Sequence, residues 1–149
     1  KGNFRFYTDG MSPSVCKISE FVDAERIAVG KALGLKLQTE IQWLRETYSL
    51  EGETLYEVLQ SSNVYGGHGP DAPKTLSHRY LTEDVPYLLV PVASLGRALG
   101  VPSPVIESII LLAGKINDKD YFSEGRTLAR MGFRSTGIES IREKLVEGA

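Results

Sequence analysis

The sequence has little cysteine, no excess of basic charge and no long hydrophobic run. Its single cysteine among 149 residues, Cys16, cannot build a disulfide framework, and this scarcity favours a reducing compartment, which we expect to be the cytoplasm. The formal net charge of −2 argues against a nucleic-acid surface, which needs a basic excess on one face. No apolar run reaches the roughly 18 residues that would span a bilayer, so no membrane segment is expected. A chain of this length can form a core without disulfides, and we expect Cys16 to be a small buried side chain.

Strand patterns are also missing. No stretch alternates apolar and polar residues convincingly, and no Asn-Gly or Asp-Gly turn joins two strand-like runs. Apolar residues recur at helical spacing instead, with capping residues before them and glycine or proline after them. The predicted helices cover residues 13–33, 40–48, 54–60, 85–99, 104–116, 119–131 and 137–146. We therefore predict an all-α fold, a helical bundle of seven or eight helices that forms one domain over residues 1–149.

Local signals predict where several helices begin. Ser12 and Ser103 each stand before a proline, a pairing that combines a capping hydroxyl with a ring suited to the first helical position. Thr39 is placed to cap the helix that follows it. The helix over residues 104–116 is apolar nearly all round, which predicts a place at the centre of the domain or in an interface.

Two segments lack a helical pattern. Residues 1–11 mix aromatic residues with glycine and aspartate, which predicts an irregular or short extended arm. Residues 61–77 contain three glycines and two prolines and predict a long loop, a kind of segment that is often functional. This loop leads the chain to His78 and Arg79.

A basic and an acidic residue stand directly before the long apolar helix predicted over residues 85–99. Arg79 and Asp84 are five residues apart, and a guanidinium and a carboxylate beside a packed helix suit a binding or catalytic site. A simpler interpretation is open for each. Asp84 is typical of an N-cap for the following helix, and Arg79 is typical of a surface arginine or of an ion-pair partner for Glu83 or Asp84.

Three separated motifs resemble one enzyme family. RYLTEDVPY and the LVPVASLGRALGVPSP that follows it begin at Arg79, FYTDGMSPSVCKISEFVDAERIAVGKALGL lies before them and DYFSEGRTLARMGF after them. Together they resemble the C-terminal helical domain of the opine dehydrogenases, which include octopine, nopaline and N-(1-carboxyethyl)-amino-acid dehydrogenases. The resemblance implies a bundle like the C-terminal domain of 6-phosphogluconate dehydrogenase-like enzymes. It also implies an N-terminal Rossmann domain that this chain does not include, so we expect a fragment of a longer protein.

The resemblance implies a reaction and two site residues. In this family a 2-oxo acid such as pyruvate condenses with the amino group of an amino acid, and NADH or NADPH reduces the resulting imine. The aspartate at the position of Asp84 pairs with a catalytic histidine, and the arginine at the position of Arg79 holds the carboxylate of the 2-oxo acid. The family's catalytic histidine would lie upstream of Lys1. We therefore expect this chain alone to be inactive, with the cofactor held mainly by the missing domain.

Other candidate residues carry weaker signals. Trp43 lies in the helix that supplies an aromatic side chain to the amino-acid side of the site in the resembled family, although core or interface packing is the simpler interpretation. His78 adjoins Arg79 and is a candidate for lining the pocket, while an ordinary surface position is the alternative for it and for His68. Residues 67–72 fit the pattern G-x-G-x-x-A, but no strand precedes them and Pro70 lacks an amide, so we expect no nucleotide site there. No cysteine, histidine or carboxylate spacing predicts a metal site.

Two alternative functions remain open at the level of sequence. In the first, the chain is a helical interaction module whose apolar helix over residues 105–113 forms the face of a homodimer. In the second, it belongs to a related enzyme of the same architecture that reduces a 2-oxo acid without any amine. Dependence on an amine separates the second alternative from an opine dehydrogenase, and no residue pattern encodes it.

Overall fold

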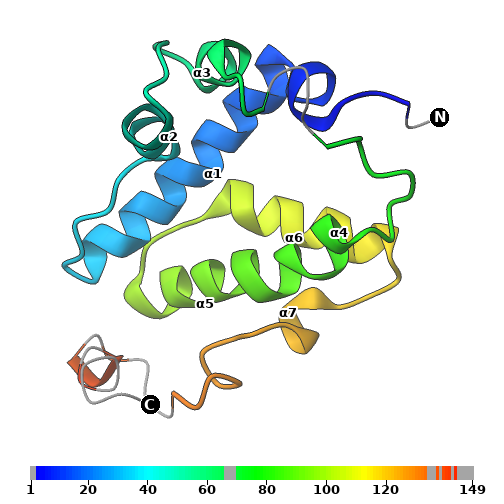
Figure 1. Ribbon diagram of the computed structural model, residues 1–149. Coiled ribbons are helices and arrows are strands. Elements are labelled where there is room, and N and C mark those ends of the chain that lie inside the picture. The colour runs from blue at the N-terminus through cyan, green and yellow to red at the C-terminus, as the bar shows by residue number, and fades with distance from the viewer. Residues whose placement is uncertain (1–2, 66–69, 134–136, 138, 142, 144–149) are drawn as a thin grey trace. The chain divides into compact units, whose positions relative to one another are not determined.

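The computed structural model describes residues 3–65, 70–133, 137, 139–141 and 143, and these residues are largely helical. They contain no strand, and one isolated bridge joins Arg5 to Asp71. The helices are α1 (Pro13–Ala32), α2 (Glu40–Tyr48), α3 (Leu55–Ser61), α4 (Arg79–Thr82), α5 (Val90–Leu99), α6 (Pro104–Ile116) and α7 (Tyr121–Glu124), with short π-helical turns η1 (Phe6–Gly10) and η2 (Val85–Leu89) (Figure 1). The predicted all-α fold is confirmed.

The chain forms two compact units. Unit 1 comprises Lys1–Ala24 and Gln38–Thr75, and unit 2 comprises Glu25–Leu37 and Leu76–Ala149. Helix α1 therefore contributes its first part to unit 1 and its last part to unit 2. That residues 1–149 act as one domain stays a prediction.

Unit 1 has a core built from α1, α2 and α3. Its buried side chains are Cys16, Leu44, Leu55, Val58 and Leu59. Ile41 and Tyr48 pack against this cluster from the side of α2 that also carries Leu44, because residues three or four apart share one face of a helix. Cys16 is buried, as predicted.

Capping side chains fix the starts of α2 and α3. Thr39 and Thr54 each form a capping box, in which the hydroxyl accepts from the third amide of the helix and a side chain in the first turn accepts from the amide of the threonine. Two carboxylates of α1 each provide a further acceptor at the start of one of these helices. Glu20 accepts from the Leu55 amide at 2.7 Å, and Asp23 accepts from the Glu40 amide at 2.9 Å. Acidic residues of α1 thus bind the N-termini of both neighbouring helices, where free N–H groups and the helix dipole favour negative charge.

The N-terminal segment differs from the prediction. The irregular or extended arm expected over residues 1–11 contains the π-helical turn η1, in which the amides of Gly10 and Met11 donate to the carbonyls of Arg5 and Phe6, five residues back. The Asp9 carboxylate accepts from the Arg5 amide at 2.9 Å and closes the same turn. An aspartate that bonds nearby backbone can stabilise such a turn without any apolar periodicity, which is why the pattern did not reveal it.

Unit 2 is built around α5 and α6, which run beside each other with α7 close to them (Figure 1). Buried residues on these helices include Val90, Ala93, Ile106, Ile110 and Ala113. The helix predicted over residues 85–99 is present, although it begins as the π-helical turn η2. Gly100 ends it with a φ of 68°, the left-handed conformation that glycine adopts at low cost.

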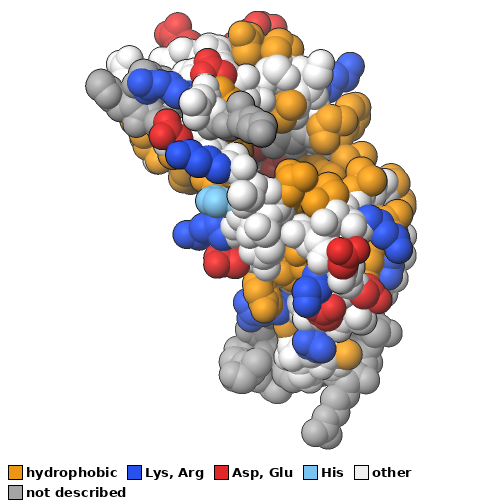
Figure 2. All heavy atoms as spheres, turned by 90° about the vertical axis from the view of Figure 1, so that its right-hand side faces the viewer, with side chains coloured by type: hydrophobic (Ala, Val, Ile, Leu, Met, Phe, Trp, Pro, Cys, Tyr) orange, Lys and Arg blue, Asp and Glu red, His pale blue; other side chains and the backbone are white. Residues whose placement is uncertain are grey.

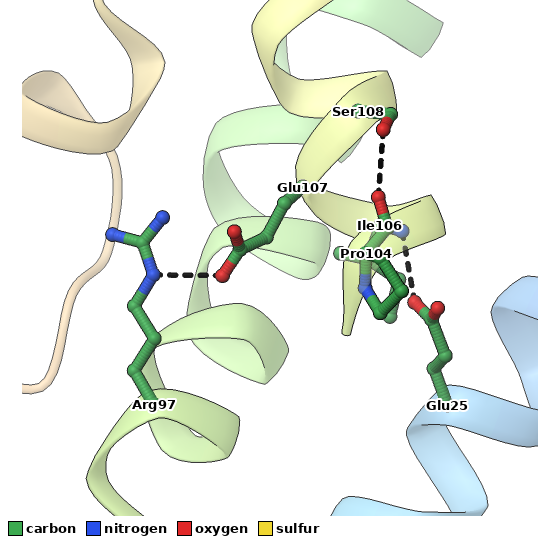
Figure 3. A network of polar contacts seen from close by, with 6 residues as sticks. All are labelled: Glu25, Arg97, Pro104, Ile106, Glu107 and Ser108. Carbon is green, nitrogen blue, oxygen red and sulfur yellow. Dashed lines mark hydrogen bonds and ion pairs between the residues drawn. The ribbon is translucent and has the colours of Figure 1, made fainter. Parts of the chain in front are cut away.

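The start of α6 is capped by a residue other than the predicted one. The Ser103 hydroxyl makes no capping bond and is a buried polar atom without a partner. Instead, the Glu25 carboxylate of α1 accepts from the amides of Val105 and Ile106 at 2.8 and 2.9 Å. Figure 3 shows the bond to Ile106. The prediction that Ser103 caps this helix is therefore wrong, because a charged acceptor from elsewhere in the fold occupies the same amides.

The segment after α6 is less helical than predicted. Over residues 119–131 only α7 is a named helix, and Gly125 continues as extended backbone. Gly125 lies so close to other backbone that an added Cβ would stand 2.6 Å from the Tyr121 carbonyl oxygen and 2.7 Å from that of Pro86. Of the helix predicted over residues 137–146, residues 139–141 and 143 are helical, and residues 138, 142 and 144–146 lie outside the described part.

Candidate functional site

The residues from His78 to Asp84 form the candidate site, and all of them lie in unit 2. His78 is the N-cap of α4, Arg79 is the first residue of α4, and Asp84 stands immediately before η2. Backbone bonds hold this segment in helical form, since the Glu83 amide donates to the Arg79 carbonyl at 2.8 Å and the Tyr87 amide donates to the Glu83 carbonyl at 3.0 Å. Arg79 therefore lies on a short helix, and Asp84 lies directly before the turn η2.

Arg79 is exposed and forms a weak ion pair. Its Nε lies 3.5 Å from Glu83 Oε2, and the two side chains are 65% and 59% exposed. An exposed pair of this kind contributes little to stability because water and salt screen it. The terminal guanidinium nitrogens make no bond to a described residue, so the planar donor fork of Arg79 is open to a carboxylate.

Asp84 does not act as a helix cap. Its backbone is already helical, and its side chain makes no capping hydrogen bond to η2. The carboxylate is half-buried and makes neither a hydrogen bond nor an ion pair with any described residue. The simpler interpretation from sequence, that Asp84 only caps the following helix, is therefore wrong. Its two oxygens can accept bonds from a further group.

His78 has a structural role in the fold. Its Nδ1 accepts from the Tyr80 amide at 3.4 Å and so caps α4, and its ring meets the Tyr80 ring edge-on with centroids 4.5 Å apart. Figure 2 shows a histidine side chain at the molecular surface with basic and acidic side chains beside it. Because capping occupies Nδ1, only Nε2 is left for a ligand. A pocket-lining role for His78 stays a prediction, and His68 lies outside the described residues.

A contact from the C-terminal region supports the start of η2. The Arg126 amide donates to the Pro86 carbonyl at 2.9 Å, next to the close approach of Gly125 to the same carbonyl. The Leu128 amide donates to Ser94 Oγ at 3.0 Å. The motif GRTL over residues 125–128 therefore contacts the backbone two residues after Asp84, which agrees with the structural role expected of it from the sequence.

Trp43 lies in unit 1, on α2, and is 45% exposed. Its ring meets that of Tyr48 edge-on at 5.7 Å, and further ring contacts link Tyr48 to Tyr65 at 5.6 Å, Tyr65 to Tyr7 at 4.6 Å and Tyr7 to Phe6 at 5.0 Å. We call these five side chains the aromatic row. The sequence pointed to Trp43 but not to Phe6, Tyr7 or Tyr65, because these come from separate segments whose contact no local pattern reveals.

Among the described residues, one cavity of unit 1 and one cavity of unit 2 are lined by side chains other than Arg79 and Asp84. One, in unit 1, has a volume of about 170 Å³ and is lined by Glu20, Asp23, Ala24, Thr39, Glu40, Ile41 and Leu55. The other, in unit 2, has about 270 Å³ and is lined by Ile110, Leu111, Gly114, Lys115, Lys119, Asp120, Tyr121 and Phe122. The carboxylates of Glu20 and Asp23 already bind helix amides, which leaves the first cavity largely apolar.

Three further features bear on the sequence predictions. The described residues hold no group of three or more histidine, cysteine or carboxylate side chains that could bind a metal ion. They contain no strand that runs through a glycine-rich turn into a helix, so the phosphate-binding motif of a dinucleotide fold has no counterpart among them. Within the same residues, no helix has both the length and the apolar character needed to cross a membrane. Part of the G-x-G-x-x-A pattern, residues 67–69, lies outside the described chain.

Comparison with known proteins identifies relatives over most of the chain. Residues 1–117 match the family described as NAD/NADP octopine/nopaline dehydrogenase, alpha-helical domain. An opine dehydrogenase of Arthrobacter sp. (strain 1C) is 40% identical over 139 residues, which are 93% of this chain and 38% of that protein. A vitopine synthase of Allorhizobium ampelinum is 32% identical over 85% of this chain and 34% of its own length. The chain thus spans little more than a third of these relatives.

A solved structure has the same fold. An octopine dehydrogenase described with NADH and L-arginine superposes with a TM-score of 0.71 and 22% identity, over 90% of this chain and 40% of the other. At that identity the likeness establishes the fold alone. The comparisons give no support to the alternative of a helical interaction module.

Proposed function

Because this chain belongs to the NAD/NADP octopine/nopaline dehydrogenase family and matches its alpha-helical domain, we propose that it is the substrate domain of an opine dehydrogenase. The enzyme would condense a 2-oxo acid such as pyruvate with the amino group of an amino acid, with loss of water, and reduce the resulting imine to a secondary amine. NADH or NADPH supplies the hydride when bound, and a Rossmann domain outside this chain would hold most of it. The curated relatives' names support this reaction class.

The observation that carries the proposal is the free carboxylate of Asp84. It is half-buried, lacks a partner among the described residues and does not cap the helix beside it. A carboxylate in this state can accept from one nitrogen of an imidazole, which fixes the tautomer and stabilises the protonated ring. We propose that Asp84 orients the catalytic histidine, which the family resemblance places upstream of Lys1. The histidine would then donate and accept the protons of the condensation.

Arg79 would hold the carboxylate of the 2-oxo acid. Its terminal nitrogens are open, and a planar fork of parallel donors matches a carboxylate in two bonds. Trp43 would contact the amino acid, and Nε2 of His78 would line the pocket next to Arg79. His78, Arg79 and Asp84 are the proposed site residues of unit 2, and Trp43 is a separate assignment in unit 1. Each assignment follows the resemblance to the family.

We propose three further properties with separate support. The single free, buried Cys16 fits a cytoplasmic enzyme. Exposed apolar side chains on α6, which include Leu111, Leu112 and Ile116, fit a homodimer. The chain alone would lack activity, because the proposed histidine and cofactor domain are not part of it.

The first test is NAD(P)H oxidation by the full-length protein, with pyruvate and a mixture of amino acids. We expect turnover to need both substrates and to fall at least about 100-fold in Asp84→Asn, which is the usual cost of losing a positioned acid–base system. Glu83→Gln is the matched control, since it removes a neighbouring exposed carboxylate and should change turnover less than twofold. Turnover without any amine would move the assignment to a simple 2-oxo acid reductase. A fully active, folded Asp84→Asn enzyme would remove Asp84 from the site.

A further inference from the structure

The backbone around Asp84 decides where its carboxylate stands. The side chain makes no capping bond to η2 and no bond to any described residue, so it has no anchor of its own among them. Helical bonds hold the backbone from within, as the Tyr87 amide donates to the Glu83 carbonyl at 3.0 Å. The position of the carboxylate therefore depends on what holds this segment against the rest of unit 2.

The carbonyl of Pro86, two residues after Asp84, lacks its usual helical donors. In an α-helix the donor would be the Val90 amide, but this amide donates to the Val85 carbonyl, five residues back. In the π-helical pattern the donor would be residue 91, which is a proline and has no N–H. Because Pro86 is buried, its carbonyl needs a donor from elsewhere in the fold.

Residues 125–128, which we call the strap, supply that donor. The Arg126 amide donates to the Pro86 carbonyl at 2.9 Å, and the Leu128 amide donates to Ser94 Oγ of α5 at 3.0 Å. The Leu128 side chain is buried in a core cluster of unit 2, which fixes the other end of the strap. The strap thus connects η2 to α5 and to the core.

Gly125 allows the strap to come this close, because no side chain would fit there. An added Cβ would stand 2.6 Å from the Tyr121 carbonyl oxygen, 2.7 Å from the Pro86 carbonyl oxygen and 3.0 Å from Val90 Cγ1. The two nearest neighbours are backbone atoms, which cannot rotate away as a flexible side chain can. The φ of −79° at Gly125 is open to any residue, so lack of space, and not backbone conformation, requires glycine.

We propose that Gly125 is a positioning residue, which sets the place of the Asp84 carboxylate by bringing the strap to the Pro86 carbonyl. This inference rests on the proposed function, since it needs Asp84 to orient the catalytic histidine. A side chain at residue 125 would displace the backbone at Pro86 by several tenths of an ångström. Such a displacement slows an acid–base step, because a misplacement of about 1 Å can cost about 100-fold in rate.

The test is a double-mutant cycle in the full-length enzyme, with kcat measured for wild type, Gly125→Ala, Asp84→Asn and the double variant. We expect Gly125→Ala to lower kcat about three- to thirtyfold in the wild type but less than about twofold in Asp84→Asn, where the carboxylate is already gone. Gly125→Ala should also move the histidine's limb of the kcat/KM pH profile to lower pH, as Asp84→Asn does, because a displaced carboxylate stabilises the protonated ring less. A purely structural loss would leave that limb in place.

Ser94→Ala is the second variant, because it removes only the acceptor of the Leu128 amide and keeps Gly125. It should change kcat and the pH profile in the same direction by a smaller factor, and it carries the test if Gly125→Ala does not fold. Gly100→Ala is the matched control. Open space surrounds that glycine, so the variant should lose stability through its backbone conformation and keep kcat within about twofold of the wild type.

Two results would overturn the inference. One is a folded Gly125→Ala enzyme with the kcat and pH profile of the wild type, and the other is an equal loss of kcat in the wild-type and Asp84→Asn backgrounds. In both cases Asp84→Asn is itself slow. A fully active Asp84→Asn enzyme would instead remove Asp84 from the site and contradict the proposed function, so the two failures are distinct.

Discussion

At the scale of single residues, Arg79 is expected to determine how tightly the 2-oxo acid binds. Its planar fork can bind a carboxylate through two parallel bonds, which the ammonium of a lysine cannot do. In the full-length enzyme we expect Arg79→Lys to raise the KM for the 2-oxo acid about tenfold or more, while the KM for the amino acid changes less than about twofold. Steady-state kinetics with each substrate varied in turn measure both. Equal increases in the two KM values would contradict a role specific to the oxo acid.

The weak ion pair between Arg79 and Glu83 implies that Arg79→Lys keeps nearly the stability of the wild type. The pair is exposed and long, so the exchange of its guanidinium for an ammonium in Arg79→Lys should change the free energy of unfolding by less than about 0.5 kcal/mol. A large loss of stability would mean that any kinetic change comes from misfolding.

Glu25 takes the capping role that the sequence predicts for Ser103. Glu25 binds two amides at the start of α6, whereas Ser103 is 3% exposed and its hydroxyl has no partner among the described residues. Removing the acceptor leaves two partly buried donors unpaired, so Glu25→Ala should cost about 1–3 kcal/mol. Ser103→Ala removes a buried hydroxyl that has no partner, so it should be neutral or stabilising by up to about 1 kcal/mol. Urea unfolding of both variants measures the difference, and a larger loss in Ser103→Ala than in Glu25→Ala would show that the serine is the true cap.

At the scale of the helices, two glycines are required for different reasons, one for lack of space and the other for its backbone conformation. Gly125 has two carbonyl oxygens within 2.7 Å of an added Cβ, while Gly100 has open space but a φ of 68°. Gly100→Ala should cost about 1 kcal/mol for the left-handed conformation. Gly125→Ala should cost more, about 2–3 kcal/mol, because backbone must move to relieve the overlap.

Gly125→Ala should also affect the candidate site, because Gly125 approaches the Pro86 carbonyl two residues after Asp84. We expect kcat of the full-length enzyme to fall in Gly125→Ala and to stay within about twofold of the wild type in Gly100→Ala. Urea unfolding and initial-rate measurements on both variants give the comparison. Equal losses of stability in Gly125→Ala and Gly100→Ala would show that the close approach of Gly125 to the carbonyls of Tyr121 and Pro86 does not exclude a Cβ there.

At the same scale, the starts of helices were easier to predict than their interiors. Thr39 caps α2 as predicted, since a threonine before an apolar periodic run is a local signal. The π-helical turns η1 and η2 were not predicted, because their i to i+5 bonds depend on how the chain packs. The acidic residues of α1 interrupt its apolar pattern in the sequence. In the structure, Glu20, Asp23 and Glu25 bind the first amides of α3, α2 and α6.

For the molecule as a whole, three weak acids make stability sensitive to alkaline pH. Burial raises the pKa of Cys16 and of Tyr121, and the bond to Tyr48 is the first cause that raises the pKa of Tyr65 from 10.0 to about 12. A pKa that is higher in the folded state means that folding favours the protonated form. The resulting stabilisation is complete below the ordinary pKa and is lost as pH rises through the folded one.

We therefore expect the urea midpoint to fall as pH rises from 10 to 12, and to fall less steeply in Tyr65→Phe. Tyr56→Phe, outside the aromatic row, should keep the wild-type slope. An identical slope in Tyr65→Phe and wild type would show that Tyr65 does not contribute to this dependence.

Association is the other property of the whole molecule that can be tested. Leu111 and Leu112 are exposed on α6, and light scattering of the full-length protein should show a dimer that Leu112→Ser weakens. Leu76→Ser, at another exposed leucine, is the control and should leave the dimer intact. A monomeric wild type would contradict the predicted homodimer.

The sequence by itself determined the all-α class, the bounds of α2 and α6, the burial of Cys16 and the family, because these depend on local spacing, on caps and on motifs that read along the chain. Tertiary structure alone decided that Glu25 replaces Ser103 as the cap of α6 and that Asp84 caps nothing. It also assembled the aromatic row from three segments. Asp84 caps nothing because its own backbone is helical. The cap of α6 and the aromatic row each join groups from separate parts of the chain, and which distant groups meet is fixed by the packing of the core, to which no local pattern gives access.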